Sequence, residues 1–146
     1  MNKKIIVGIG IMVLIVLAIF MFKGSSTPTG EVITELDAVR IPVSDISKNA
    51  QFYSYERIEY FVVEDKSGDV KTAFNACDVC YGAKKGYSQK GEDMVCNNCG
   101  NHYSISGLGT KNLRGGGCWP GYLPSKVEGD YLVIEKSDLE TGRYRF

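Results

Sequence analysis

Hydrophobic residues fill the first part of the chain without a break. Every residue from 5 to 22 is apolar or Gly, and as a helix this segment is roughly 27 Å long, close to the thickness of the bilayer core. The run exceeds the apolar core of a secretory signal and no small-x-small cleavage site follows it, so we expect a transmembrane anchor over residues 1–23. Lys3 and Lys4 favour a cytoplasmic N-terminus, which predicts a single-pass cell-membrane protein with an extracytoplasmic C-terminal domain.

After the anchor, short apolar runs alternate with polar turns. Residues 24–37 begin with a stretch rich in Ser, Thr, Gly and Pro, which is typical of a linker and leaves residues 38–146 for the folded domain. The turn sequences DKSGD and KGED each separate two apolar runs and therefore predict two β-hairpins. The strands expected from this pattern cover residues 38–43, 51–55, 58–63, 70–74, 86–89, 94–95 and 131–135.

Composition supports a mostly β fold and restricts the function. Aromatic residues make up 11% of the chain and it contains 17 Gly, which suits short strands joined by tight turns better than long helices. The 17 basic residues are balanced by 17 acidic ones, so the chain lacks the basic footprint of a nucleic-acid-binding protein. No two carboxylates are placed for general acid and base catalysis, and we expect no enzymatic activity.

Four cysteines form the strongest chemical signal, a C-x2-C-x15-C-x2-C pattern at the ends of predicted strands. Two residues between cysteines allow a tight turn to direct both thiolates to one point, and two such turns suit either zinc or an iron-sulfur cluster. Two disulfides would leave an odd fifth cysteine, and c-type haem would need His after each pair, where Tyr81 and Gly100 stand. The expected metal ligands are Cys77, Cys80, Cys96 and Cys99.

Two further residues are candidates for the same site. His102 is the only His of the chain and follows Cys99 by three residues, so it is a candidate ligand or a hydrogen-bond donor to one, although a partly exposed strand residue is the favoured interpretation. Cys118 follows three glycines and precedes Trp119 and Pro120, a loop that allows close backbone approach. It is either a further ligand or a buried free thiol.

The motifs FNACDVCYGAKKGYSQKGEDMVCNNCGNHYSI, GGGCWPGYLP and VEGDYLVI together resemble the membrane iron-sulfur FtrD-like family. The resemblance covers nearly the whole region after the linker. It implies an iron-sulfur protein associated with membrane redox chemistry, with a redox or iron-permease partner in the membrane. It also implies that Cys77, Cys80, Cys96 and Cys99 are the ligands and that Cys118 is a further functional position.

A weaker resemblance is to Rieske domains, in which two ligand loops on a β-scaffold are followed by a proline-containing loop and a closing strand. Rieske loops pair one Cys with one His, whereas Cys80 and Cys99 stand where those histidines would be expected. We therefore expect a small Rieske-like or rubredoxin-like β-domain, with a [2Fe-2S] cluster favoured and a potential below the Rieske range. The expected function is electron transfer; the alternatives are a zinc-stabilised interaction module and an iron- or copper-handling protein.

Overall fold

The computed structural model describes residues 32–112 and 117–146. Within them the chain is mostly β and forms three antiparallel sheets, in agreement with the fold class expected from the sequence. The predicted transmembrane anchor, residues 1–23, lies outside the described residues. Among the residues that are described, no helix has the length and apolar character needed to cross a membrane.

The first sheet, called sheet A, has the strand order β1-β2-β11-β10. Its inner strands pair antiparallel over five residues each, with Ile41 opposite Leu132. The helix α2 (Lys136–Glu140) follows β11 directly. Strand β1 falls within residues 24–37, where a linker was expected, and pairs with β2 through Ile33 and Thr34. The bounds of these strands are β1 (Ile33–Thr34), β2 (Ala38–Pro42), β10 (Lys126–Glu128) and β11 (Tyr131–Glu135).

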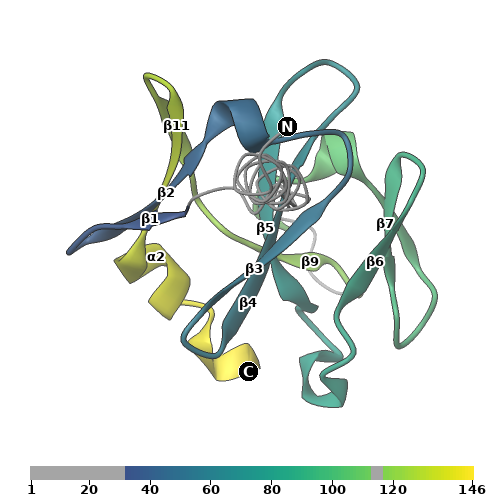
Figure 1. Ribbon diagram of the computed structural model, residues 1–146. Coiled ribbons are helices and arrows are strands. Elements are labelled where there is room, and N and C mark those ends of the chain that lie inside the picture. The colour runs from purple at the N-terminus through teal and green to yellow at the C-terminus, as the bar shows by residue number, and fades with distance from the viewer. Residues whose placement is uncertain (1–31, 113–116) are drawn as a thin grey trace, which may run out of the picture.

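The second sheet, sheet B, has the order β3-β4-β5-β9 and lies between the other two sheets (Figure 1). Its hairpin β4-β5 is the one predicted from DKSGD. Asp65 closes that turn, because its Oδ1 accepts the N–H groups of Ser67 (2.8 Å) and Asp69 (3.1 Å). The strands are β3 (Gln51–Tyr55), β4 (Ile58–Glu64), β5 (Val70–Cys77) and β9 (Pro120–Tyr122).

The third sheet, sheet C, has three strands in the order β6-β7-β8. The pair β6-β7 is the second predicted hairpin, and β7 ends at Cys96. The strands are β6 (Tyr87–Lys90), β7 (Asp93–Cys96) and β8 (His102–Ser104). Short 3-10 turns complete the described part of the fold: η1 (Val43–Asp45), η2 (Tyr81–Ala83), η3 (Ile105–Gly107) and η4 (Arg143–Arg145).

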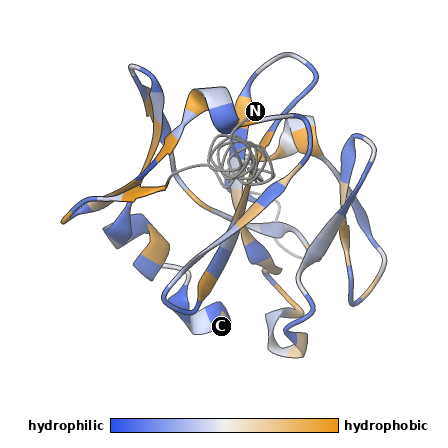
Figure 2. Ribbon diagram, viewed as in Figure 1, coloured by the Kyte–Doolittle hydropathy of each residue, from blue (hydrophilic) through white to orange (hydrophobic). Residues whose placement is uncertain are grey.

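Two clusters of buried side chains hold the sheets together. The first joins sheets A and B and includes Ile41, Tyr60 and Leu132. The second joins sheets B and C and includes Phe61, Met94 and three of the cysteines, Cys77, Cys96 and Cys118. Figure 2 shows the hydrophobic residues concentrated in the strands, while most of the turns are hydrophilic. The cysteine loops therefore lie next to a core of buried, mostly apolar side chains.

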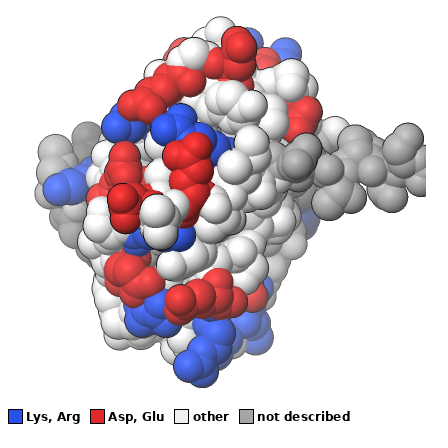
Figure 3. Space-filling model, turned by 60° about the vertical axis from the view of Figure 1, so that its left-hand side comes forward, with Lys and Arg blue, Asp and Glu red and all other residues white. Residues whose placement is uncertain are grey.

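Surface charge is of mixed sign on the side of the molecule that carries β1, β2 and β11. Acidic and basic side chains alternate over the face that Figure 3 presents. Ion pairs of this kind join Arg40 to Glu35 (3.1 Å) and Lys126 to Glu128 (2.9 Å) and Glu135 (3.3 Å). They are at least partly exposed, so each contributes little to stability. This face has no extensive field of one sign.

Candidate metal centre

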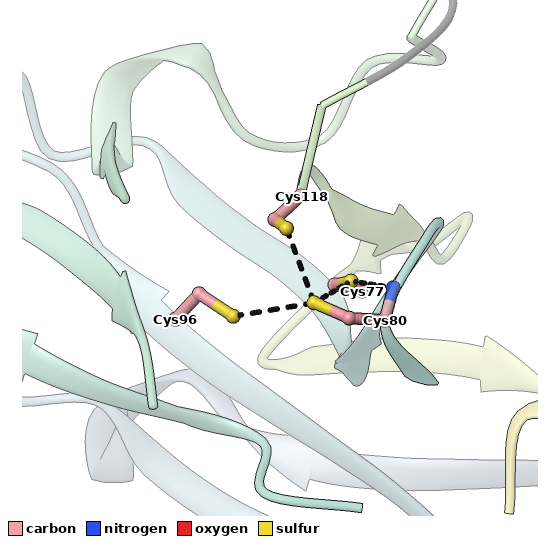
Figure 4. A group of neighbouring side chains, drawn as sticks. All are labelled: Cys77, Cys80, Cys96 and Cys118. Carbon is pink, nitrogen blue, oxygen red and sulfur yellow. Dashed lines mark hydrogen bonds between the residues drawn. The ribbon is translucent and has the colours of Figure 1, made fainter. Parts of the chain in front are cut away.

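Four cysteine sulfur atoms gather at the interface of sheets B and C. The Sγ atoms of the group all lie within 4.8 Å of one another, and the side chains point toward a common centre (Figure 4). The group draws on three separate stretches of chain: the end of β5 with the turn after it, the end of β7, and the segment before β9. We call these four residues, Cys77, Cys80, Cys96 and Cys118, the inner thiol group.

Cys80 occupies the middle of the inner thiol group. Its Sγ lies 3.0 Å from that of Cys77, 3.1 Å from that of Cys118 and 3.8 Å from that of Cys96. No disulfide is present among the described residues, where all five cysteines of the chain are free thiols. Cys80 is partly exposed while the other three are buried. The group is consequently close to the surface, and Cys80 is its most exposed member.

Hydrogen bonds from the backbone fix the conformation of the first ligand loop, residues 77–80. The N–H groups of Val79 and Cys80 both donate to the Cys77 sulfur, at 3.3 and 2.6 Å. After Cys80, the turn η2 carries the chain away from the site. Donation from two amides stabilises negative charge on sulfur, which opposes the effect of burial on Cys77.

The second ligand loop repeats this arrangement. The N–H groups of Asn98 and Cys99 donate to the Cys96 sulfur, as those of the corresponding residues do in the first loop. The turn closes with a hydrogen bond from Gly100 N–H to Cys96 O (2.8 Å), and Gly100 has a φ of +74°. Glycine adopts that conformation without steric cost, which explains the residue at this position.

Strand pairing brings Cys118 to the two loops. In the β5-β9 ladder Pro120 lies opposite Cys77, and the N–H of Asp78 donates to Trp119 O (2.9 Å). The hydroxyl of Tyr87 donates to the carbonyl of Cys118 itself. Cys118 is thereby held by its own backbone against the ends of two sheets, and only 8% of its surface is exposed.

Cys99 and His102 lie outside the inner thiol group. Cys99 is exposed, although its thiol still interacts with those of Cys96 and Cys118. The His102 ring lies on the exposed side of β8, where its Nδ1 is 3.0 Å from Asp93 Oδ2. The structure thus gathers three of the four cysteines expected as ligands, together with Cys118, and gives His102 a carboxylate partner away from the sulfur atoms.

The thiols differ in acidity because each has different neighbours. Hydrogen bonds from the thiols of Cys77 and Cys118 lower the pKa of Cys80 to about 7. Burial is the main cause of the raised pKa values of Cys77 and Cys96. The pKa of Cys118 is raised above its ordinary value, first by its hydrogen bond to Cys80. Four ionised thiolates at this spacing need a cation among them.

Aromatic rings pack around the inner thiol group. The buried Tyr87 ring lies 6.3 Å from those of Phe61 and Tyr103, and Tyr103 lies 5.3 Å from Trp119, measured between centroids. Burial and the nearby Cys77 raise the pKa of Tyr87, so its hydroxyl stays protonated as a donor. The rings exclude water from the inner side of the site.

The C-terminal residues pack against the outer side of the first ligand loop. No motif in the sequence predicts this contact. Arg145 Nη2 lies 2.8 Å from Asp78 Oδ1, in the first ligand loop, and the side chain of Arg145 is only 11% exposed. Lys84 Nζ donates to the Phe146 carbonyl oxygen (2.7 Å), and the rings of Tyr81 and Tyr144 meet edge to face. We call residues 143–146, with these contacts, the C-terminal clasp. A cavity of about 370 Å³ lies beside the clasp and reaches Cys77, Cys80 and Cys96.

The donor set of the inner thiol group fits a metal centre. It consists of sulfur alone, the ligand that zinc, copper(I) and iron-sulfur centres share. Around one tetrahedral ion, at a metal–sulfur distance of about 2.3 Å, sulfur atoms are about 3.8 Å apart. The Cys80 sulfur lies 3.0, 3.1 and 3.8 Å from the other three, so one separation equals that value and two are shorter. The residues present can therefore surround one ion with little rearrangement.

Comparison with known proteins gives one family. The model of the family described as membrane iron-sulfur containing protein FtrD-like matches residues 34–146, a range that contains both ligand loops, Cys118 and the C-terminal clasp. No curated protein matches the chain. The match confirms the resemblance drawn from the cysteine motifs.

Proposed function

Because the chain belongs to the FtrD-like family of membrane iron-sulfur proteins, we propose that it transfers single electrons through an iron centre held by cysteine thiolates. One observation carries this proposal: four free thiols meet within 4.8 Å at the edge of a dry core. When bound, a Cys-ligated iron centre supplies reversible one-electron chemistry at a potential set by its surroundings.

The surroundings of the thiols suit that role. Amide donors to Cys77 and Cys96 stabilise thiolate charge in both oxidation states, and the rings around Tyr87 exclude water. On the other side, Val79 stands between two of the cysteines with 60% of its surface exposed. A partner that docks over this loop would come close to the centre without any change in fold. This supports exchange of electrons with another protein rather than chemistry on a buried substrate.

The form of the centre has two candidates. The paired C-x2-C loops favour a [2Fe-2S] cluster in a Rieske-like arrangement, in which each pair would bind one iron. The second candidate is a single tetrahedral ion, as in a rubredoxin-like iron site or a zinc site. Thiolates divided between two irons must spread farther apart, so the close spacing around Cys80 favours this second form. A zinc ion would make the domain a non-redox interaction module.

Attachment to the membrane determines where in the cell the protein would act. Family membership makes the protein membrane-associated. We propose further that residues 1–23 anchor it with the domain outside the cytoplasm, where it serves a membrane redox system or an iron permease. The positive charge of Lys3 and Lys4 supports this orientation.

The test is the composition of the full chain, purified without oxygen in detergent. Iron, zinc and acid-labile sulfide are measured together with the absorption spectrum and a redox titration. Iron with equimolar sulfide indicates a cluster, and iron without sulfide indicates a single-ion site. Either supports electron transfer if the iron is reduced and reoxidised reversibly. A colourless protein with stoichiometric zinc would contradict the proposal.

Cys96→Ser provides the first prediction from this function. Cys96 belongs to the inner thiol group and receives two amide hydrogen bonds, so its loss should weaken metal binding by more than about a hundredfold. Metal content and thermal unfolding of the variant are compared with those of the parent chain. Full occupancy with an unchanged spectrum would show that Cys96 is not a ligand.

A further inference from the structure

The inner thiol group and Cys99 together make five cysteines, one more than a tetrahedral site needs. We propose that Cys118, and not Cys99, is the fourth ligand, and that Cys99 is a free thiol through which the metal enters and leaves. This inference rests on the proposed function only in requiring that the thiols hold a metal. It gives the site a second property, exchange of its metal with thiol-bearing molecules outside.

The position of Cys118 supports its role as a ligand. Its sulfur is 3.1 Å from the central Cys80, whereas Cys99 does not belong to the group of sulfur atoms within 4.8 Å of one another. The carbonyl of Cys118 is held by Tyr87, and the next residue, Trp119, accepts a hydrogen bond from the first ligand loop. A thiol fixed by its own backbone and buried between two loops needs no movement to bind.

The position of Cys99 supports its role in exchange. It lies on the same turn as Cys96, three residues further along the chain, but is exposed. An incoming molecule can therefore reach Cys99 while the inner thiol group stays closed. Among the five cysteines, all of which lie in the described residues, Cys99 is the only exposed one.

The exchange step is a ligand substitution without oxidation or reduction. With a metal bound, the Cys99 sulfur would form a bond to it as the bond from Cys118 breaks, and the proton from Cys99 would pass to the Cys118 sulfur. The metal is then held partly by an exposed ligand. A thiol from outside would replace Cys99 in the same way and would give its proton to the Cys99 sulfur, so that each bond that breaks is matched by one that forms.

Alkylation of the metal-loaded full chain tests the assignment. The protein, in detergent and without oxygen, is treated with iodoacetamide, and the modified cysteines are located by mass spectrometry. We expect one modified residue, Cys99, while Cys118 stays protected until the metal is removed. Modification of Cys118 with protection of Cys99 would overturn the inference, as would protection or modification of both.

Two matched variants test the roles separately. Cys99→Ser should keep its metal but release it to EDTA about tenfold more slowly, whereas Cys118→Ser should bind metal about a hundredfold more weakly. Equal metal loss in both variants would overturn the assignment, and the alkylation result stands even if Cys118→Ser fails to fold. If zinc is found in place of iron, the proposed function fails while these experiments still decide the roles of Cys99 and Cys118.

Discussion

Gly142 illustrates how a single residue without a side chain allows the C-terminal clasp to close. A Cβ atom at this position would lie 2.3 Å from two ring carbons of Phe74, a distance at which one of them must move. Phe74 is fully buried in the cluster that joins sheets A and B. The close approach of chain and ring is therefore a packing requirement and not a matter of backbone conformation.

The close approach of Gly142 to Phe74 predicts the effect of a larger residue at position 142. Gly142→Ala should lower the free energy of unfolding by about 1–3 kcal/mol, because Phe74 cannot move without disturbing the core. Gly82→Ala is the matched control, since a Cβ there would meet nothing within 4 Å. Urea unfolding of the full chain in detergent measures both. Similar stability of the two variants would show that the ring adjusts without cost.

Among single residues, the cysteines show where sequence spacing is informative and where it is not. The two C-x2-C pairs predict metal binding because each turn is local. Spacing also predicts Cys99 as the fourth ligand, whereas the structure places Cys118 in the inner thiol group. The position of Cys118 depends on the pairing of Pro120 with Cys77, which are far apart in the chain, and local patterns carry no information on such a pairing.

At the scale of elements, strands with strong local signals were predictable. The predictions for residues 51–55 and 131–135 agree with β3 and β11 in full, because the first is rich in aromatic residues and the second is a continuous apolar run after a Gly-Asp turn. Strand β9 (Pro120–Tyr122) was missed, since Pro and Gly disfavour strands and only its pairing with β5 forms it. The five-residue helix α2 is too short to show a helical period.

The C-terminal clasp is the element that links stability to the metal centre. Arg145 is nearly buried and binds Asp78, whereas Arg143 is 44% exposed and pairs with Glu56 and Glu140. Arg145→Met should cost about 1–3 kcal/mol, because Asp78 loses a charged hydrogen bond in the first ligand loop. It should also speed the release of metal by about tenfold, since that loop becomes less fixed.

Arg143→Met is the control for this prediction, because its exposed ion pairs contribute little. Unfolding in urea and the rate of metal transfer to EDTA are measured for both variants. If Arg145→Met releases metal no faster than Arg143→Met, the clasp stabilises the fold without acting on the ligand loop.

At the scale of the whole molecule, orientation in the membrane decides which partners the domain can meet. A reporter enzyme that is active only outside the cytoplasm, fused after Phe146, should be active, because Lys3 and Lys4 favour a cytoplasmic N-terminus. A flexible Gly-Ser linker is needed, since the Phe146 carbonyl binds Lys84. A second fusion with a reporter active only in the cytoplasm is the control. Activity of that second fusion alone would reverse the orientation.

The spread of the inner thiol group over three stretches of chain has a consequence for chain entropy. A metal bound to Cys77, Cys96 and Cys118 acts as a cross-link that closes two loops, and closed loops reduce the freedom of the unfolded chain. Sheet C lies between these attachment points in sequence, so removal of the metal should loosen it first. Hydrogen exchange of the full chain should then quicken in β6–β8 while β2 and β11 stay protected. Equal quickening in all three sheets would mean that the domain unfolds as one unit.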